Sequence, residues 1–489
     1  MFKQSFRRCL LGGSLLAGIP ASLPAERFHF HDDRVLGTSF DLTIETVSST
    51  VAAAAETAAK AEIERLEGLL STYQIDSEIS KLNRSERLTI SEDLINVLRS
   101  AEQWHARTEG AFSGRLGALL ARWREAAQAD ILPPRPELRV LAGEINTAEV
   151  VIDPATNQVT RPASVIWATD GVAKGYIIDH AFAAARRALP AGTGILLDIG
   201  GDLRFAGSPP AGNTWEIGIA DPAAPPASNA APLMTLALTE GAVATSGYSP
   251  RNYMIGGKSY SHILDSQSGW ASDRNVAASV LAPDTATADA LATAFMVMTT
   301  QAGLALAESL PATEALVITA DGRQFASSGW FDHVKPAAGP TGLAPFTVHL
   351  DYDVPELDVA RYRPPYVAIW ITDARRQLVR GLSLRGDQTR WQEENYVWWR
   401  RYARKVPALV DALSQPSPLP GRYPIVWDGR DDFGQGVPRG TYTLNIEEAR
   451  EHGDHTLVQI PLELGNADLD ETHPAEGELG RIHVRYAAP

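Results

Sequence analysis

The pattern of apolar and polar positions predicts a chain that mixes helices and strands up to about residue 335 and contains mainly strands beyond it. Residues 28–46 alternate like a strand or a pair of strands, with Leu36-Gly37-Thr38 between the two halves. Apolar residues recur at helical spacing over 51–70, and Ser91 is placed as the N-cap of a helix over 91–108. Other helices are predicted over 76–83, 171–189 and 285–299, and a loop followed by a helix over 110–127. Two strands each are predicted over 150–168 and 194–207, and single strands over 215–220, 233–238 and 275–282.

The stretch 244–270 gathers polar side chains around a predicted hairpin. Residues 254–260 form its arms, because Gly256-Gly257 supplies the positive φ that a tight turn needs. Pairing of the arms is expected to bring together two polar ends, which carry Ser246, Arg251, Asn252, His262 and Asp265. A polar surface hairpin whose histidine is satisfied by hydrogen bonds is the alternative interpretation.

Asp289 and Thr293 lie four positions apart in the helix predicted over 285–299, so they share one of its faces. The residues around them are mainly alanine and leucine, and a carboxylate on an apolar face needs a partner. A hard cation with oxygen ligands would be such a partner. A hydrogen bond between the two side chains at a helix interface is the alternative.

Lys174 lies in the first turn of the helix predicted over 171–189, where a positive charge opposes the helix dipole. An anion beside the start of this helix would remove the conflict. The alternative is a surface lysine whose charged end reaches solvent.

A linker rich in proline and glycine is predicted over 335–342. Beyond it, residues 346–353, 366–373 and 378–384 alternate like strands with turn residues at short spacing, which predicts a small β-sandwich over 345–489. The aromatic residues of 396–402 are expected in its core.

Composition limits the classes of partner. The chain has 489 residues, which favours two or three domains, and 44% of them are hydrophobic. Its formal net charge of −15 argues against nucleic acid and against an anionic membrane surface as partners. A small anion held locally by arginine, backbone amides or a metal remains compatible with this charge.

Residues 1–25 have the pattern of a signal peptide. Arg7 and Arg8 precede a short apolar run over 9–19, which is too short to span a bilayer, and no transmembrane span is expected in the mature chain. We therefore expect a periplasmic or otherwise exported protein; a short buried helix is the alternative. The single cysteine, Cys9, lies in this segment, so a metal in the mature chain is expected to use oxygen or imidazole ligands.

An ordered set of motifs between residues 27 and 335 resembles the FAD:protein FMN transferase (ApbE) family. The motifs are Leu36-Gly37-Thr38, Ser71-Thr72-Tyr73, Gly110-Ala111-Phe112, Gly171-Val172-Ala173-Lys174-Gly175-Tyr176, Asp198-Ile199-Gly200-Gly201-Asp202, Thr245-Ser246-Gly247-Tyr248, His262-Ile263-Leu264-Asp265 and Ala288-Asp289-Ala290-Leu291-Ala292-Thr293. The resemblance implies an α+β domain over 26–340. It also implies magnesium-dependent transfer of FMN from FAD to a Thr or Ser hydroxyl of a target flavoprotein, with release of AMP.

The resemblance also implies roles for individual residues. Tyr73 is expected to pack on the isoalloxazine ring. Catalytic roles fall on His262 and Asp289, and the metal ligands are expected to be the Gly171 carbonyl, Asp289 and Thr293. The residues expected to bind FAD are Leu36, Tyr73, Phe112, Ser113, Gly114, Lys174, Ser246, Arg251 and Ile263.

The chain departs from the common family pattern at three positions. Leu36 stands where Met is usual, Ser113 stands where Asp is usual, and Ala168 replaces an acidic residue, with Asp170 close by. The C-terminal part resembles a periplasmic β-rich domain of unknown function, which implies no chemistry.

Other functions compatible with these residues are a FAD pyrophosphatase, with water as the acceptor, and a non-catalytic periplasmic flavin-binding protein. The whole chain could also serve as an interaction protein through its sandwich. The Asp289–Thr293 pair argues against both non-enzymes. The general base is left open between a carboxylate and His262.

Overall fold

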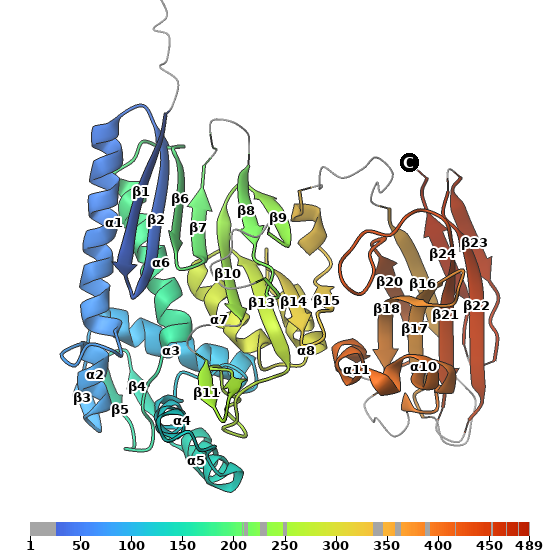
Figure 1. Ribbon diagram of the computed structural model, residues 1–489, viewed down its shortest axis with the longest axis horizontal. Coiled ribbons are helices and arrows are strands. Elements are labelled where there is room, and N and C mark those ends of the chain that lie inside the picture. Colours follow the sequence, from blue (N-terminus) through green and yellow to red (C-terminus); the bar gives the residue numbers. More distant parts are fainter. Residues whose placement is uncertain are drawn as a thin grey trace, which may run out of the picture.

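The computed structural model describes residues 26–488 except 208, 210–213, 225–231, 248–251, 336–345, 357–362, 387–391, 416, 451–452, 466 and 478. The segment expected to be a signal peptide and most of the predicted linker lie outside these residues. Two bodies lie side by side along the longest axis, an α+β body and an all-β body (Figure 1).

An eight-stranded antiparallel sheet forms the centre of the first body, in the order β1-β2-β6-β7-β10-β13-β14-β15. Its strands are β1 Glu26–Val35, β2 Thr38–Thr46, β6 Gly194–Ile199, β7 Asp202–Ala206, β10 Gly241–Gly247, β13 Asn275–Ala282, β14 Glu314–Thr319 and β15 Gln324–Ala326. The stretch 28–46, expected as a strand or a pair of strands, forms the pair β1 and β2. The turn between them contains Leu36 at φ 52° and Gly37 at φ 72°.

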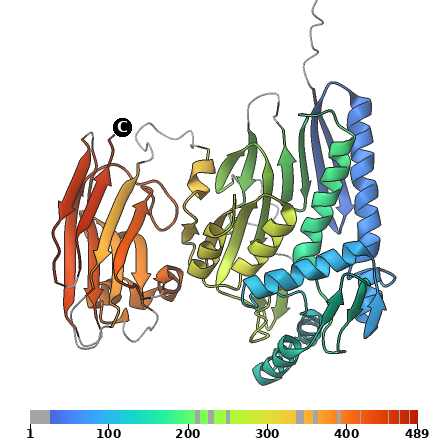
Figure 2. The same ribbon diagram turned by 180° about the vertical axis from the view of Figure 1, so that it is seen from behind.

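Helices cover one face of this sheet. They include α1 Ser49–Leu70, α2 Glu78–Asn83, α3 Glu92–Arg107, α6 Asp170–Arg187, α7 Thr285–Phe295 and α8 Thr300–Glu308. Figure 2 shows α6 and α7 in front of the strands. Ser91 caps α3 as predicted, since its hydroxyl accepts the backbone N–H of Leu94. The largest core lies between these helices and the sheet, with Leu42, Leu197 and Leu291 fully buried in it.

A second core lies on the opposite face of the sheet. The hairpin of β8 Trp215–Ile219 and β9 Met234–Leu238 packs there with Trp330 of the short helix η1 Trp330–His333. The central strands are therefore buried on both faces.

A smaller satellite core holds the predicted hairpin. The hairpin consists of β11 Tyr253–Ile255 and β12 Lys258–Tyr260, and Gly256 and Gly257 take positive φ between them, as predicted. It packs on α4 Gly117–Ala129 and α5 Arg135–Thr147, where Trp123 stacks on Tyr253 with ring centroids 5.6 Å apart. A small sheet of β3 Arg87–Thr89, β5 Gln158–Thr160 and β4 Val151–Asp153 completes this part of the first body.

The helix predicted over 285–299 is wrong in its extent. The α7 helix ends at Phe295, and α8 begins after Thr299, whose hydroxyl accepts the backbone N–H of Ala302. Two distant side chains bind the carbonyls at the end of α7. Asn275, the first residue of β13, donates to the Phe295 carbonyl at 2.7 Å, and Ser272, just before β13, donates to the Met296 carbonyl. This capping by distant residues divides the expected helix in two.

The second body is the predicted β-sandwich. One sheet contains β20 Gly421–Trp427, β16 Val348–Val354, β24 Ile482–Tyr486 and β23 Leu469–His473, in that order. The other contains β19 Ser414–Gln415, β18 Leu378–Arg385, β17 Tyr366–Asp373, β21 Thr441–Ala449 and β22 His455–Glu463. Their inner faces enclose one core, and the helices α10 Tyr396–Arg401 and α11 Pro407–Leu413, with the short η2 Ala403–Lys405, cover the outer face of the second sheet. Trp398 of the aromatic segment is fully buried, as expected.

The two bodies share a tightly packed contact at β15. Phe325 of the first body is buried in the outer core of the second, among Trp370 and Trp398. The backbone N–H of Gln324 donates to the backbone carbonyl of Asp432 at 2.7 Å, and the Asp432 carboxylate forms an ion pair with Arg323 at 3.2 Å. The bodies are therefore joined by a hydrophobic and hydrogen-bonded interface as well as by the chain.

Candidate functional site

The candidate metal residues lie where α6 crosses α7. Gly175 allows the crossing, because a Cβ there would lie 2.5 Å from the carbonyl oxygen of Thr285. The carboxylate of Asp289, on α7, accepts the backbone N–H of Gly175 at 3.3 Å. In an α-helix that N–H is the partner of the Gly171 carbonyl, so the bond ties the Asp289 carboxylate to the turn that carries this carbonyl.

Thr293 lies one turn further along α7 and faces the same region. A Cβ on Gly171 would lie 3.1 Å from the Thr293 hydroxyl oxygen and 3.2 Å from the ring of Phe112, so these three residues pack together. The hydroxyl of Ser246, at the end of β10, lies 3.4 Å from that of Thr293. Four of the predicted site residues are thus adjacent.

The charges around Asp289 favour a cation. Asp289 is 7% exposed, and burial raises the pKa of its carboxyl well above the usual value. The nearby carboxylates of Asp202 and Asp170 raise this pKa as well, while Lys174 lowers it. The available donors are a carboxylate, a hydroxyl and a carbonyl, a set made of oxygen alone that fits a hard divalent cation such as magnesium.

Lys174 forms an ion pair with a carboxylate of the protein. Its ammonium group lies 2.9 Å from the carboxylate of Asp202 and donates to the Gly200 carbonyl at 3.1 Å. Gly200 in turn packs against Thr38, because a Cβ on it would lie 2.5 Å from the Thr38 hydroxyl. The β1–β2 turn that contains Leu36 therefore lies beside the Lys174 contact. The sequence indicated that an anion was needed here but did not identify Asp202.

Tyr73 is an exposed aromatic ring held in place at its hydroxyl. Its side chain follows the end of α1 and is 78% exposed. The hydroxyl donates to one oxygen of Asp170 at 3.2 Å, and Thr72 donates to the other at 3.1 Å. A large exposed ring whose hydroxyl is held by a hydrogen bond is suited to stacking with a planar ligand.

Of the polar residues expected to converge at the hairpin, Asn252 lies beside His262, whereas the Asp265 carboxylate accepts hydrogen bonds from Gln267 and Ser268 within its own turn. The side-chain oxygen of Asn252 accepts the backbone N–H of His262 at 3.3 Å and lies 3.1 Å from its Nδ1. Ile263 follows and is nearly buried in the same core as Phe112. Arg251, the other predicted residue of this stretch, lies outside the described residues.

The loop before α4 holds the remaining predicted residues. Phe112 is buried, and the Ser113 hydroxyl accepts the backbone N–H of Arg115 at 3.3 Å. Gly114 packs closely on α3, since a Cβ on it would lie 2.9 Å from the Cβ of Ala101. Ser113 and Gly114 thus shape the loop next to Phe112, and their contact with FAD stays a prediction.

Comparison with known proteins identifies the family of this domain. The profile of the ApbE family matches residues 36–317. The chain belongs to the ApbE family. A Vibrio cholerae protein named FAD:protein FMN transferase is 28% identical over 327 residues, which cover 65% of this chain and 95% of the relative. A Salmonella typhimurium protein of the same name is 28% identical over 280 residues, covering 55% of this chain and 78% of the relative.

Solved structures agree with this assignment. The crystal structure of the ApbE protein from Thermotoga maritima is similar, with a TM-score of 0.57 and 25% identity, covering 64% of this chain and all of that protein. The flavin transferase ApbE from Vibrio cholerae gives a TM-score of 0.53 at 26% identity, covering 63% of this chain and all of that one. The α+β fold implied by the motifs is confirmed.

The second body matches a different family. Residues 347–481 match the profile described as "Predicted periplasmic protein (DUF2271)". This match supports the periplasmic expectation. None of the helices among the described residues is long and apolar enough to cross a membrane.

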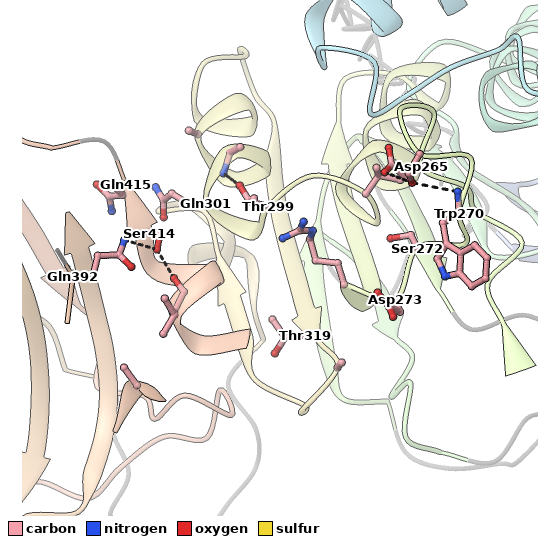
Figure 3. A pocket seen from close by; sticks show the side chains of 18 of the residues that line it. Asp265, Trp270, Ser272, Asp273, Thr299, Gln301, Thr319, Gln392, Ser414 and Gln415 are labelled. Carbon is pink, nitrogen blue, oxygen red and sulfur yellow. Dashed lines mark hydrogen bonds between the residues drawn. The ribbon is translucent and has the colours of Figure 1, made fainter. Parts of the chain in front are cut away.

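A cavity of about 1350 Å³ lies between the ApbE-family domain and the sandwich (Figure 3). Asp265, Trp270 and Ser272 line one side of it, while Gln392 and Ser414 of the sandwich line the other. Neither Tyr73 nor Asp289 is among its lining residues. The lining residues from Asp265 to Ser272 follow His262 and Ile263 in the sequence. This segment therefore runs from the candidate site to the interface between the two domains.

Three residues of the site were not selected from the sequence as site residues. Asp170 positions Tyr73, Asp202 pairs with Lys174, and Asn252 orients His262. The signal for Asp170 was its closeness to Ala168, where the family usually has an acidic residue. Asp202 belongs to a motif that was recognised, but its partner depends on a contact across the fold, and Asn252 was named only as one of the polar residues of the hairpin.

Proposed function

We propose that this protein transfers FMN from FAD to a Thr or Ser hydroxyl of a target flavoprotein, with magnesium, and releases AMP. Membership of the ApbE family and the names of the relatives support transfer from FAD. The observation that carries the proposal is the set of oxygen donors at the α6–α7 crossing, Asp289, Thr293 and the Gly171 carbonyl, in an acidic and largely buried environment.

The proposed reaction is a displacement at phosphorus. The acceptor oxygen forms a bond to the phosphorus of the FMN half, the bond to the bridging oxygen breaks, AMP leaves, and the hydroxyl proton passes to a base. Magnesium bound by Asp289, Thr293 and the Gly171 carbonyl would neutralise charge on the pyrophosphate. Tyr73 would hold the flavin ring, which fixes the distance between the phosphate and the acceptor.

His262 is suited to receive the proton. The side-chain oxygen of Asn252 accepts the backbone N–H of His262, which fixes the orientation of the amide. The same oxygen lies 3.1 Å from Nδ1 and already accepts an N–H, which favours the tautomer with the proton on Nδ1. The lone pair is then on Nε2, the form of imidazole that a general base requires.

Flavin transfer can be tested directly. The protein should be incubated with FAD, magnesium and candidate periplasmic flavoproteins, and covalent flavin should be measured by in-gel fluorescence. We expect a fluorescent target band whose formation stops when magnesium is chelated. Release of FMN and AMP without any labelled target would instead identify a FAD pyrophosphatase, and FAD binding without turnover would identify a flavin carrier.

Replacing Tyr73 by alanine is expected to weaken FAD binding more than it slows the reaction of bound FAD. Loss of stacking removes on the order of 1 kcal/mol beyond the buried area, or about a fivefold increase in the dissociation constant. Tyr73→Phe is the matched control, because it keeps the ring and removes only the hydrogen bond to Asp170. Titration of FAD by fluorescence measures both variants, and unchanged affinity in Tyr73→Ala would contradict the stacking role.

A further inference from the structure

A second cluster of metal-binding side chains lies on the β1–β2 hairpin, outside the candidate flavin site. Within the described part of the chain, His29, His31 and Asp41 form a group whose ligand atoms all lie within 4.8 Å of one another. The hairpin register explains the group. His31 is directly opposite Asp41, and His29, two positions earlier, lies on the same face of the strand. Phe28 and Phe30 occupy the other face and pack on the main core.

The separations between these atoms suit a shared ion. The Nε2 of His29 lies 3.2 Å from an oxygen of Asp41, and the Nδ1 of His31 lies 2.8 Å from the same oxygen. Ligands on a tetrahedral zinc ion, with bonds of about 2.0–2.1 Å, are about 3.3 Å apart. Since the side chains are partly exposed, small rotations can open the shorter distance to this value.

Each histidine also has a partner for its other ring nitrogen. The Nε2 of His31 lies 2.9 Å from the carboxylate of Asp33, and the Nδ1 of His29 lies 3.3 Å from the hydroxyl of Thr43. A histidine that binds a metal usually donates its remaining N–H to a carboxylate or another acceptor, which fixes the tautomer and the ring orientation. Here both rings are oriented with Nε2 of His29 and Nδ1 of His31 toward Asp41.

The surroundings of the cluster are acidic. Asp41 on β2 lies opposite Asp198 in the register with β6, so two carboxylates occupy facing positions on neighbouring strands. Asp33 adds a third, whereas Arg27 is bonded to Glu45 and Lys60 to Asp32 and Glu56. Like charges at directly opposite positions destabilise a sheet, and a cation bound at Asp41 would reduce the repulsion.

We infer that His29, His31 and Asp41 bind a divalent transition-metal ion of the zinc class, which fastens the edge strand β1 to β2. Two imidazoles and one carboxylate match the ligands of zinc and differ from the oxygen ligands of magnesium at Asp289. Three protein ligands leave a further position for water. The site is independent of FAD, and it would brace the hairpin whose turn carries Leu36.

The inference is tested by titrating the metal-free protein with zinc in excess magnesium, which occupies sites made of oxygen ligands. Calorimetry is expected to give one zinc ion per chain, and cobalt in its place is expected to give the visible absorption of a tetrahedral site. His31→Ala and His29→Ala should each weaken zinc binding at least about tenfold. Failure of the wild-type protein to bind zinc would overturn the inference.

Two control variants separate this cluster from other metal-binding groups. His180→Ala removes a histidine that lies 3.7 Å from Glu62 but belongs to no cluster of three possible metal ligands among the described residues, and it should leave zinc binding unchanged. Asp289→Ala removes the proposed magnesium ligand and should also leave it unchanged. His31→Ala could melt at a lower temperature than the wild type even without metal. Addition of zinc should nevertheless raise the melting temperature of the wild type and leave that of His31→Ala unchanged. Equal zinc binding by the wild type and both histidine variants would contradict the assignment.

Discussion

Replacing Asp289 by alanine is expected to abolish the magnesium-dependent turnover of FAD while leaving the fold intact. Asp289 supplies the only carboxylate among the three proposed ligands, so its loss removes charge as well as geometry. The charge stabilisation that a bound metal gives to phosphoryl transfer amounts to several kcal/mol, which corresponds to a loss of at least about a hundredfold in rate. The burial that raises the pKa of this carboxyl also means that the folded protein gains little from its charge when no metal is bound.

Asp284 offers a matched control on the same helix. Its side chain caps α7 by accepting the backbone N–H of Thr287 at 2.8 Å. Asp284→Ala is therefore expected to cost about 1 kcal/mol of stability and to leave turnover nearly unchanged. Circular dichroism and release of AMP should be measured on both variants. Full turnover by Asp289→Ala at saturating magnesium, with no other metal present, would overturn the metal assignment.

Local structure was predictable at several places where it depends on residues close in the sequence. Gly256-Gly257 has the positive φ values that its turn requires, and Ser91 caps its helix because the acceptor and the donor are three positions apart. The spacing of Asp289 and Thr293 likewise fixed their common face. The family motifs then added the fold and the region of the site, which periodicity alone does not provide.

Contacts between distant segments were not predictable in this way. Nothing in the pattern around Lys174 indicates that its anion is Asp202, because the contact depends on how α6 lies across the turn between β6 and β7. The division between α7 and α8 depends on Asn275, which the position of β13 in the sheet brings to the end of α7. The contact of Asp432 with Arg323 links residues 109 positions apart and gives no periodic signal.

A chain that ends at Lys335 is expected to keep FAD affinity and turnover but to unfold at a lower temperature and to aggregate more readily. Every proposed site residue precedes residue 300, so the chemistry should remain. Truncation uncovers Phe325, which is only 4% exposed in the whole protein, and burial of one such side chain contributes about 2 kcal/mol. The same truncation also removes one wall of the cavity between the domains.

Phe325→Ser in the truncated chain is the matched variant, because it replaces the uncovered apolar side chain and touches no proposed site residue. It should restore solubility without changing FAD affinity. If the sandwich helps to dock the target flavoprotein, both truncated chains should show a higher KM for that protein while turnover of FAD stays constant. A soluble truncated protein that no longer binds FAD would contradict the proposed division into domains, because the flavin site would then require residues beyond the linker.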